Sequence, residues 1–125
     1  MFSQIRTSKE NKEVVTKLTR RLNLGAENII ARIAFSYSLS KNQKLVLSKI
    51  SNSSGKEYSK PVLFGENYDI YIGMLCVHYN LYKTDKDIPK YVKMHIDNGL
   101  DLINQELEDN PNIEGFDYLV EKINV

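Results

Sequence analysis

The sequence predicts a small, mainly α-helical domain with a short extended segment at its N-terminus. Apolar residues recur at spacings of three and four along most of the chain, whereas residues 3–7 alternate as a strand does. The chain has 125 residues, of which 42% are hydrophobic and 26% charged, a composition typical of folded globular proteins. This length suits one hydrophobic core, so we expect a single domain over residues 1–125.

The first predicted elements are a short strand and a helix. In the alternating stretch Arg6 lies on the polar side and Ile5 on the other. Thr7 and Glu10 have the spacing of a capping box, which places the start of a helix at about residue 8. Gly25 is expected to end this helix in a left-handed conformation. The expected buried stripe consists of Val14, Val15, Leu18 and Leu22.

A second helix is predicted directly after that turn, roughly from Ala26 to Leu39. The order of short strand, basic helix, glycine turn and apolar helix is also that of ribbon-helix-helix modules, in which a two-stranded ribbon from a dimer enters the major groove of DNA. On that interpretation Gln4 and Arg6 face DNA. The expected buried stripe of the second helix consists of Ile29, Ile30, Ile33, Ala34 and Tyr37, with Arg32 opposite.

The middle of the chain is less regular. Residues 44–50 fit either a strand or the tail of the second helix, residues 51–55 form the clearest loop, and residues 56–68 are expected to be a connector without periodicity. The stretch 67–82 is apolar over most of its circumference, which predicts a central helix buried on several sides. Its expected row consists of Ile70, Met74, Val77 and Leu81.

Two further helices are predicted towards the C-terminus. Pro89 suits the first turn of a helix that runs to about Leu107, and the sequence Asn-Pro-Asn at 110–112 separates it from a short last helix. The expected buried rows are Val92, Ile96, Leu100 and Ile103 in the longer helix and Phe116, Leu119, Val120 and Ile123 in the shorter one.

The net charge of +1 conceals a strong asymmetry along the chain. The basic half, residues 1–60, carries twelve Lys and Arg against four acids, a net charge of +8, and the acidic helical half, residues 61–125, carries −7. A basic half supplies the sequence-independent attraction to phosphates that dominates DNA affinity, although two halves that neutralise each other explain the same charges. On the first interpretation the DNA-binding residues are Arg6, Lys9, Lys12, Lys17, Arg20, Arg21 and Arg32.

The sequence does not indicate a catalytic or metal site, and no cofactor is expected. His78 and His95 lie on apolar helical patterns, as packing histidines do, and burial would make the single cysteine, Cys76, unreactive. No apolar run approaches the ~20 residues of a membrane span, and the first residues lack the apolar core of a secretory signal, so we expect a cytoplasmic protein. The acid pairs expected on the solvated surface are Asp85/Asp87, Asp97/Asp101 and Glu106/Asp109.

Three blocks of the sequence resemble the DndE proteins of bacterial DNA phosphorothioation systems. They are the opening IRTS with the later segment NLGAENIIARIAFSYSL, the block from Gly55 to Tyr68, and the block from His95 to Leu100. The resemblance covers about residues 1–105, and the residues after about 110 have no counterpart in it.

The resemblance implies a small, non-enzymatic component of the machinery that replaces a non-bridging phosphate oxygen of DNA with sulfur. It implies binding to double-stranded DNA, preferentially nicked, assembly into a homotetramer, and work beside a cysteine desulfurase, an iron–sulfur protein and an ATPase. Three alternatives stay open: an adaptor that binds only partner proteins, a ribbon-helix-helix transcription regulator, and a carrier of sulfur on Cys76.

Overall fold

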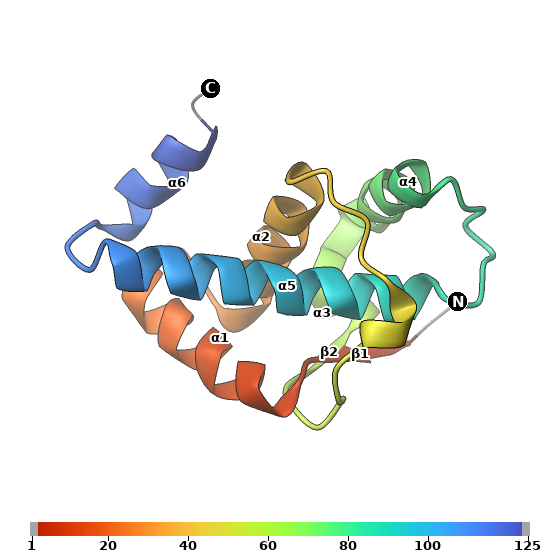
Figure 1. Cartoon of the computed structure of the whole chain (residues 1–125), viewed down its shortest axis with the longest axis horizontal. Helices are drawn as coiled ribbons and strands as arrows, with labels where there is room; N and C mark the ends of the chain where they lie inside the picture. The colour runs from red at the N-terminus through yellow and green to blue at the C-terminus, as the bar shows by residue number, and fades with distance from the viewer. Residues whose placement is uncertain (1–2, 124–125) are drawn as a thin grey trace.

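The computed structural model describes residues 3–123, which form a helical domain with a short two-stranded sheet (Figure 1). The predicted mainly α class is confirmed. No helix in this described part of the chain is long and apolar enough to cross a membrane. In chain order the elements are β1 (Gln4–Arg6), α1 (Lys9–Leu22), α2 (Glu27–Ser40), the 3₁₀ turn η1 (Leu47–Lys49), β2 (Glu57–Ser59), α3 (Lys60–Phe64), the 3₁₀ turn η2 (Gly65–Asn67), α4 (Tyr68–Tyr79), α5 (Ile88–Asp109) and α6 (Gly115–Ile123).

The N-terminal segment is a strand, as predicted, and its partner comes from the same chain. β1 pairs antiparallel with β2, which places Ile5 opposite Tyr58 with both side chains buried. In a ribbon-helix-helix module this strand pairs with a second copy, so the intramolecular pairing contradicts that architecture. The prediction of an irregular connector over 56–68 is also wrong, because β2 and α3 occupy it; both are too short for periodicity to reveal.

α1 has the predicted position but not the predicted caps. The hydroxyl of Ser8, rather than that of Thr7, accepts the hydrogen bond from the backbone N–H of Asn11, at 3.2 Å. The hydroxyl of Thr7 instead accepts from the backbone N–H of Lys56, beside β2, at 2.8 Å. At the other end Asn23, not Gly25, adopts the left-handed conformation (φ 52°), which asparagine tolerates better than most residues.

α5 is the central helix of the domain, and α2 crosses it and packs against it (Figure 1). Its predicted row is buried throughout. The two helices cross at Gly99, where a Cβ atom would lie 1.9 Å from the carbonyl oxygen of Ala34, so a side chain at this position would force the helices apart. The buried face of α2 is rotated from the predicted stripe and consists of Ile30, Ala31, Ala34, Phe35, Ser38 and Leu39.

Two helices expose apolar faces that the sequence predicts as buried. α4 lies at one side of the domain instead of its centre, and Ile70 and Val77 are 63% and 84% exposed. α6 likewise exposes Phe116 and Ile123, while Tyr118 on another side of the helix is buried. Periodicity shows that a helix has an apolar face but not whether its own chain covers that face. Residues 44–50 form neither a strand nor a helix tail but a loop that contains η1.

Both histidines have packing and hydrogen-bonding partners, as predicted. His95 is buried, with Nδ1 2.7 Å from the hydroxyl of Ser38 and Nε2 2.7 Å from that of Tyr79. His78 contacts the carbonyl oxygen of Gln43 through Nε2 at 2.6 Å and stands edge-on to His95. Burial, together with the neighbouring His78, lowers the pKa of His95 from 6.5 to about 4.

This lowered pKa predicts a loss of stability in mild acid. The unfolded chain takes up the proton of His95 near its ordinary pKa of 6.5, whereas the folded chain resists it down to about 4. The stabilisation is therefore complete above about pH 6.5, and about 3 kcal/mol of it is lost as the pH falls to about 4. Urea unfolding across this range measures the loss. His95→Gln, which does not titrate, should show a flatter profile; identical profiles would contradict the assignment.

Candidate nucleic-acid interface

The basic residues of α1 line one side of the helix and form a shallow surface groove. Lys9, Lys12, Lys17 and Arg20 are exposed and line this hollow of about 550 Å³ together with Glu13, Thr16 and Ser54. We call it the α1 groove. Lys9 and Lys12 are three residues apart, as are Lys17 and Arg20, and Glu13 and Thr16 lie between the two pairs. Residues at spacings of three and four lie on the same side of a helix, so the positive charges follow the helix axis. The structure thus brings together four of the seven basic residues that the sequence predicts.

Three cations of the groove have no ion-pair partner among the described residues, although Glu13 also lines it. Lys9, Lys12 and Arg20 make no ion pair or side-chain hydrogen bond with any residue in the described part of the chain. Lys17 is held by contacts of Nζ with Asn104 Oδ1 at 2.9 Å and Glu108 Oε1 at 3.6 Å. Both members of that ion pair are more than half exposed, so it contributes little stability, and a phosphate can replace Glu108 at small cost.

The three remaining predicted residues lie elsewhere and have partners. Arg6 on β1 forms an ion pair with Glu57 on β2, with Nε 2.8 Å from Oε1. Arg21 donates from Nη2 to the carbonyl oxygen of Pro111 at 2.9 Å. Arg32 donates from Nε to the carbonyl oxygen of Leu63 at 2.7 Å, which ties α2 to the end of α3. The sequence cannot distinguish these structural arginines from free ones, because their partners come from distant parts of the chain.

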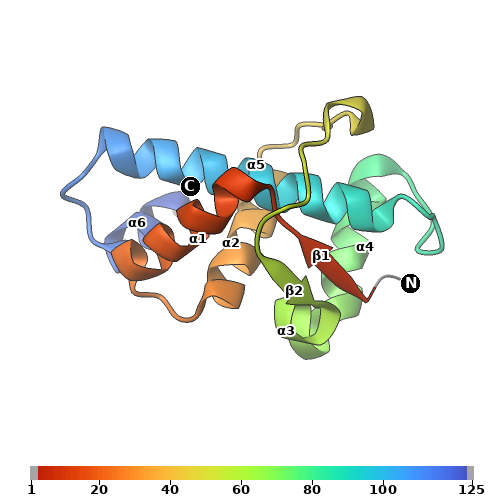
Figure 2. The same cartoon turned by 90° about the horizontal axis from the view of Figure 1, so that it is seen from below.

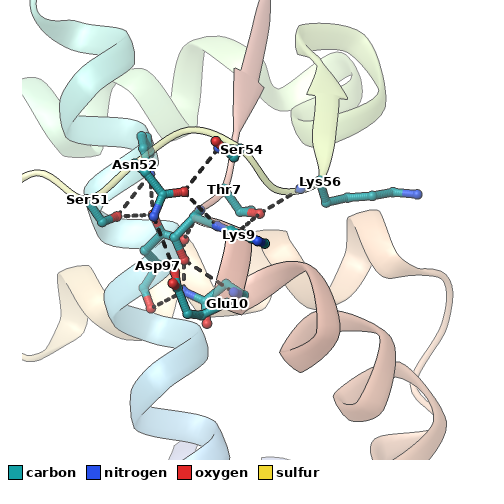
Figure 3. A network of polar contacts seen from close by, with 11 residues as sticks. Thr7, Lys9, Glu10, Ser51, Asn52, Ser54, Lys56 and Asp97 are labelled. Carbon is teal, nitrogen blue, oxygen red and sulfur yellow. Dashed lines mark hydrogen bonds and ion pairs between the residues drawn. The ribbon is translucent and has the colours of Figure 1, made fainter.

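A polar network fixes the start of α1 against α5 and the loop before β2 (Figure 3). Asp97 Oδ1 on α5 accepts from the backbone N–H of Ser8 at 3.1 Å and from the side-chain amide of Asn11 at 2.9 Å. Its other oxygen pairs with the ammonium of Lys93 at 2.5 Å and accepts from the hydroxyl of Ser51 at 3.2 Å. The Lys93 side chain is 5% exposed, so this is a buried ion pair.

The loop 51–55 completes the anchoring of the groove. Asn52 Oδ1 accepts from the backbone N–H of Lys9 at 2.9 Å, so the first turn of α1 is capped from outside the helix. Figure 2 shows this loop passing the start of α1 on its way to β2. At Gly55 a Cβ atom would lie 2.0 Å from the carbonyl oxygen of Ser8, so only a glycine lets the loop approach this closely.

In two of the acid pairs one member is not the solvated residue that the sequence predicts, whereas Asp101 and Asp109 are exposed as expected. Asp97 is buried in the network around Lys93, and Glu106 is half-buried between α2 and α6. Glu106 accepts from the hydroxyl of Tyr37 at 2.7 Å and pairs with Lys122 at 2.7 Å. The four-residue spacing of Lys93 and Asp97 on α5 is the one sequence signal that indicates such a pair.

The side chains considered for reaction or metal binding are the single cysteine and clusters of His, Cys, Asp and Glu within residues 3–123. Cys76 is half-buried, and burial raises the pKa of its thiol, which reduces the thiolate available for reaction. Within residues 3–123 no three His, Cys, Asp or Glu side chains gather closely enough to hold a metal ion.

Comparison with known proteins shows the family. Residues 4–110 match the family of DNA sulphur modification protein DndE. A similar solved structure is that of DndE from Escherichia coli B7A, involved in DNA phosphorothioation modification. Its sequence identity is 20% and its TM-score 0.66, and the match covers 82% of this chain and 98% of the Escherichia coli chain. A glycine-to-lysine double variant of DndE involved in DNA phosphorothioation gives a TM-score of 0.68 at 20% identity, with coverage of 82% and 98%. A search of curated proteins finds no match. Because the family match spans most of its length, the chain belongs to the DndE family of DNA sulphur modification proteins.

Proposed function

We propose that this protein is a non-catalytic, DNA-binding subunit of the DNA phosphorothioation machinery, and that it binds duplex DNA through the phosphate backbone. The observation that carries this proposal is the α1 groove, in which Lys9, Lys12 and Arg20 present unpaired positive charge. Such contacts attract phosphates without reading the base sequence. Membership of the DndE family supports the connection to sulfur modification of DNA.

Preference for nicked DNA is part of the proposal. A nick makes the duplex locally easier to bend, so a protein surface gains further phosphate contacts at a lower deformation cost. Several copies of the α1 groove, aligned in a homotetramer, would contact more phosphates than one copy can. The acidic half of the chain, with its net charge of −7, then remains for the other proteins of the phosphorothioation machinery.

Fluorescence anisotropy tests this function directly. The purified protein is titrated into labelled DNA of one sequence in intact, nicked and single-stranded form, at several salt concentrations. We expect the tightest binding to the nicked duplex. The plot of log affinity against log salt should have a slope of about −3 or steeper, because three unpaired cations release about that many counterions per protomer. Absence of binding to all three DNAs at moderate salt would overturn the proposal and favour an adaptor that binds only proteins.

A further inference from the structure

The outer side of α4 is an apolar surface that the described chain leaves open. Ile70, Met74 and Val77 follow each other at helical spacing and are 63%, 41% and 84% exposed. Gly73 lies between them and is also exposed. We call these residues the α4 face. α4 is apolar over most of its circumference, and such a helix is normally covered on several sides.

Gly73 has open space around it, unlike Gly99 in α5 and Gly115 at the start of α6. A Cβ at Gly99 would lie 1.9 Å from the backbone of α2, and one at Gly115 would lie 1.8 Å from the carbonyl oxygen of Leu22. At both positions the contact with a neighbouring helix of the same chain therefore requires glycine. Around Gly73 nothing lies within 4 Å of a Cβ position. Glycine is unfavourable in a helix interior compared with alanine, so its presence here indicates the close approach of a backbone from outside the chain.

The exposed charges at the two ends of the α4 face have opposite signs. Glu66 and Asp69 lie at its N-terminal end, and Lys83 follows its C-terminal end. All three are exposed and none forms an ion pair within residues 3–123. An antiparallel helix with the same sequence places its basic end beside these acids and its acidic end beside Lys83. A parallel arrangement places like charges together and is disfavoured.

We propose that the α4 face binds the α4 face of a second copy of this chain, antiparallel, across a two-fold axis at Gly73. A two-fold contact uses the same patch on both copies, so the patch must complement itself in shape and charge. The α4 face does so: a glycine at the crossing point permits close approach, apolar residues flank it, and opposite charges lie at its ends. The α1 groove lies on a different helix and stays open to DNA.

This interface rests on the self-assembly in the proposed function. A disulfide test asks whether the α4 face in particular forms the contact between copies. In a Cys76→Ser background, Gly73→Cys supplies the only thiol of the chain and places it on the proposed axis. Helices that cross closely at this point bring the two Cα atoms within the range of a disulfide. We expect most of the oxidised protein to migrate as a covalent dimer on a denaturing gel. The matched control Gln105→Cys, at an exposed position of α5, should remain monomeric.

Sedimentation equilibrium gives the second measurement. Gly73→Leu has open space in the single chain, so its helical circular dichroism should match that of the unmodified protein. Its dissociation constant for self-association should rise at least about tenfold, because the leucine prevents the close crossing. Unmodified protein that stays monomeric would overturn self-assembly and this interface together. An oligomer that survives Gly73→Leu and gives no disulfide would overturn the α4 interface alone.

Discussion

Reversing two charges of the α1 groove, with Lys12→Glu and Arg20→Glu together, is expected to weaken binding to duplex DNA by about a hundredfold at about 0.1 M salt. The double variant loses two phosphate contacts and adds two repulsive charges beside the remaining cations. Both side chains are exposed and make no ion pair within the described residues, and glutamate is a good helix former, so the fold should persist. Anisotropy on the nicked duplex measures the affinity, and circular dichroism checks the helix content.

The matched control is Lys44→Glu together with Lys49→Glu. These lysines belong to the same basic half and are also exposed, but they lie in the loop around η1 and outside the α1 groove. The control changes the net charge by the same amount, so it separates the effect of a specific surface from that of overall charge. We expect only a few-fold loss of affinity. Equal losses in the two variants would contradict a groove on α1 and indicate diffuse attraction to the basic half.

The sequence predicts the helices well because the patterns that indicate a helix involve residues that are close together in the chain. Pro89 and the apolar spacing place α1, α2 and α5 within a few residues of their ends, although the predicted caps of α1 are wrong. What covers each helix depends on contacts between distant residues, and so the burial of α4 is wrongly predicted although its apolar pattern is evident. The pairing of β1 with β2 is missed for the same reason: it joins residues separated by more than fifty positions, with three residues in each strand.

The groove is only partly predictable from sequence. Counting Lys and Arg finds the charge, and helical spacing places four of the cations on one side of α1. The structure adds what fixes that helix: Asp97 and Gly55 contact its first turn from two other segments. Arg32 and Arg6, by contrast, have partners within the domain that no local pattern reveals.

Asp97→Ala is expected to destabilise the domain by about 3–5 kcal/mol, because it leaves the buried ammonium of Lys93 without a counter-charge. The substitution also removes the acceptor for the backbone N–H of Ser8 and for the amide of Asn11. A loss of this size is a large share of the stability of a small domain. Urea unfolding measures it. The control Asp109→Ala, at an exposed position near the end of α5, should change the free energy of unfolding by less than about 0.5 kcal/mol.

Adding Lys93→Met to Asp97→Ala decides whether the buried charge of Lys93 causes the loss of stability. If the uncompensated ammonium dominates the loss, the double variant lacks that charge and should be more stable than Asp97→Ala alone, by about 1–3 kcal/mol. The part that is not recovered measures the capping of α1, since Ser8 and Asn11 still lack their acceptor. A double variant less stable than the single one would show that Asp97 acts mainly as a cap. In that case the affinity of the α1 groove for DNA should fall with Asp97→Ala even where the domain remains folded, because Lys9 and Lys12 lie in the turn that frays.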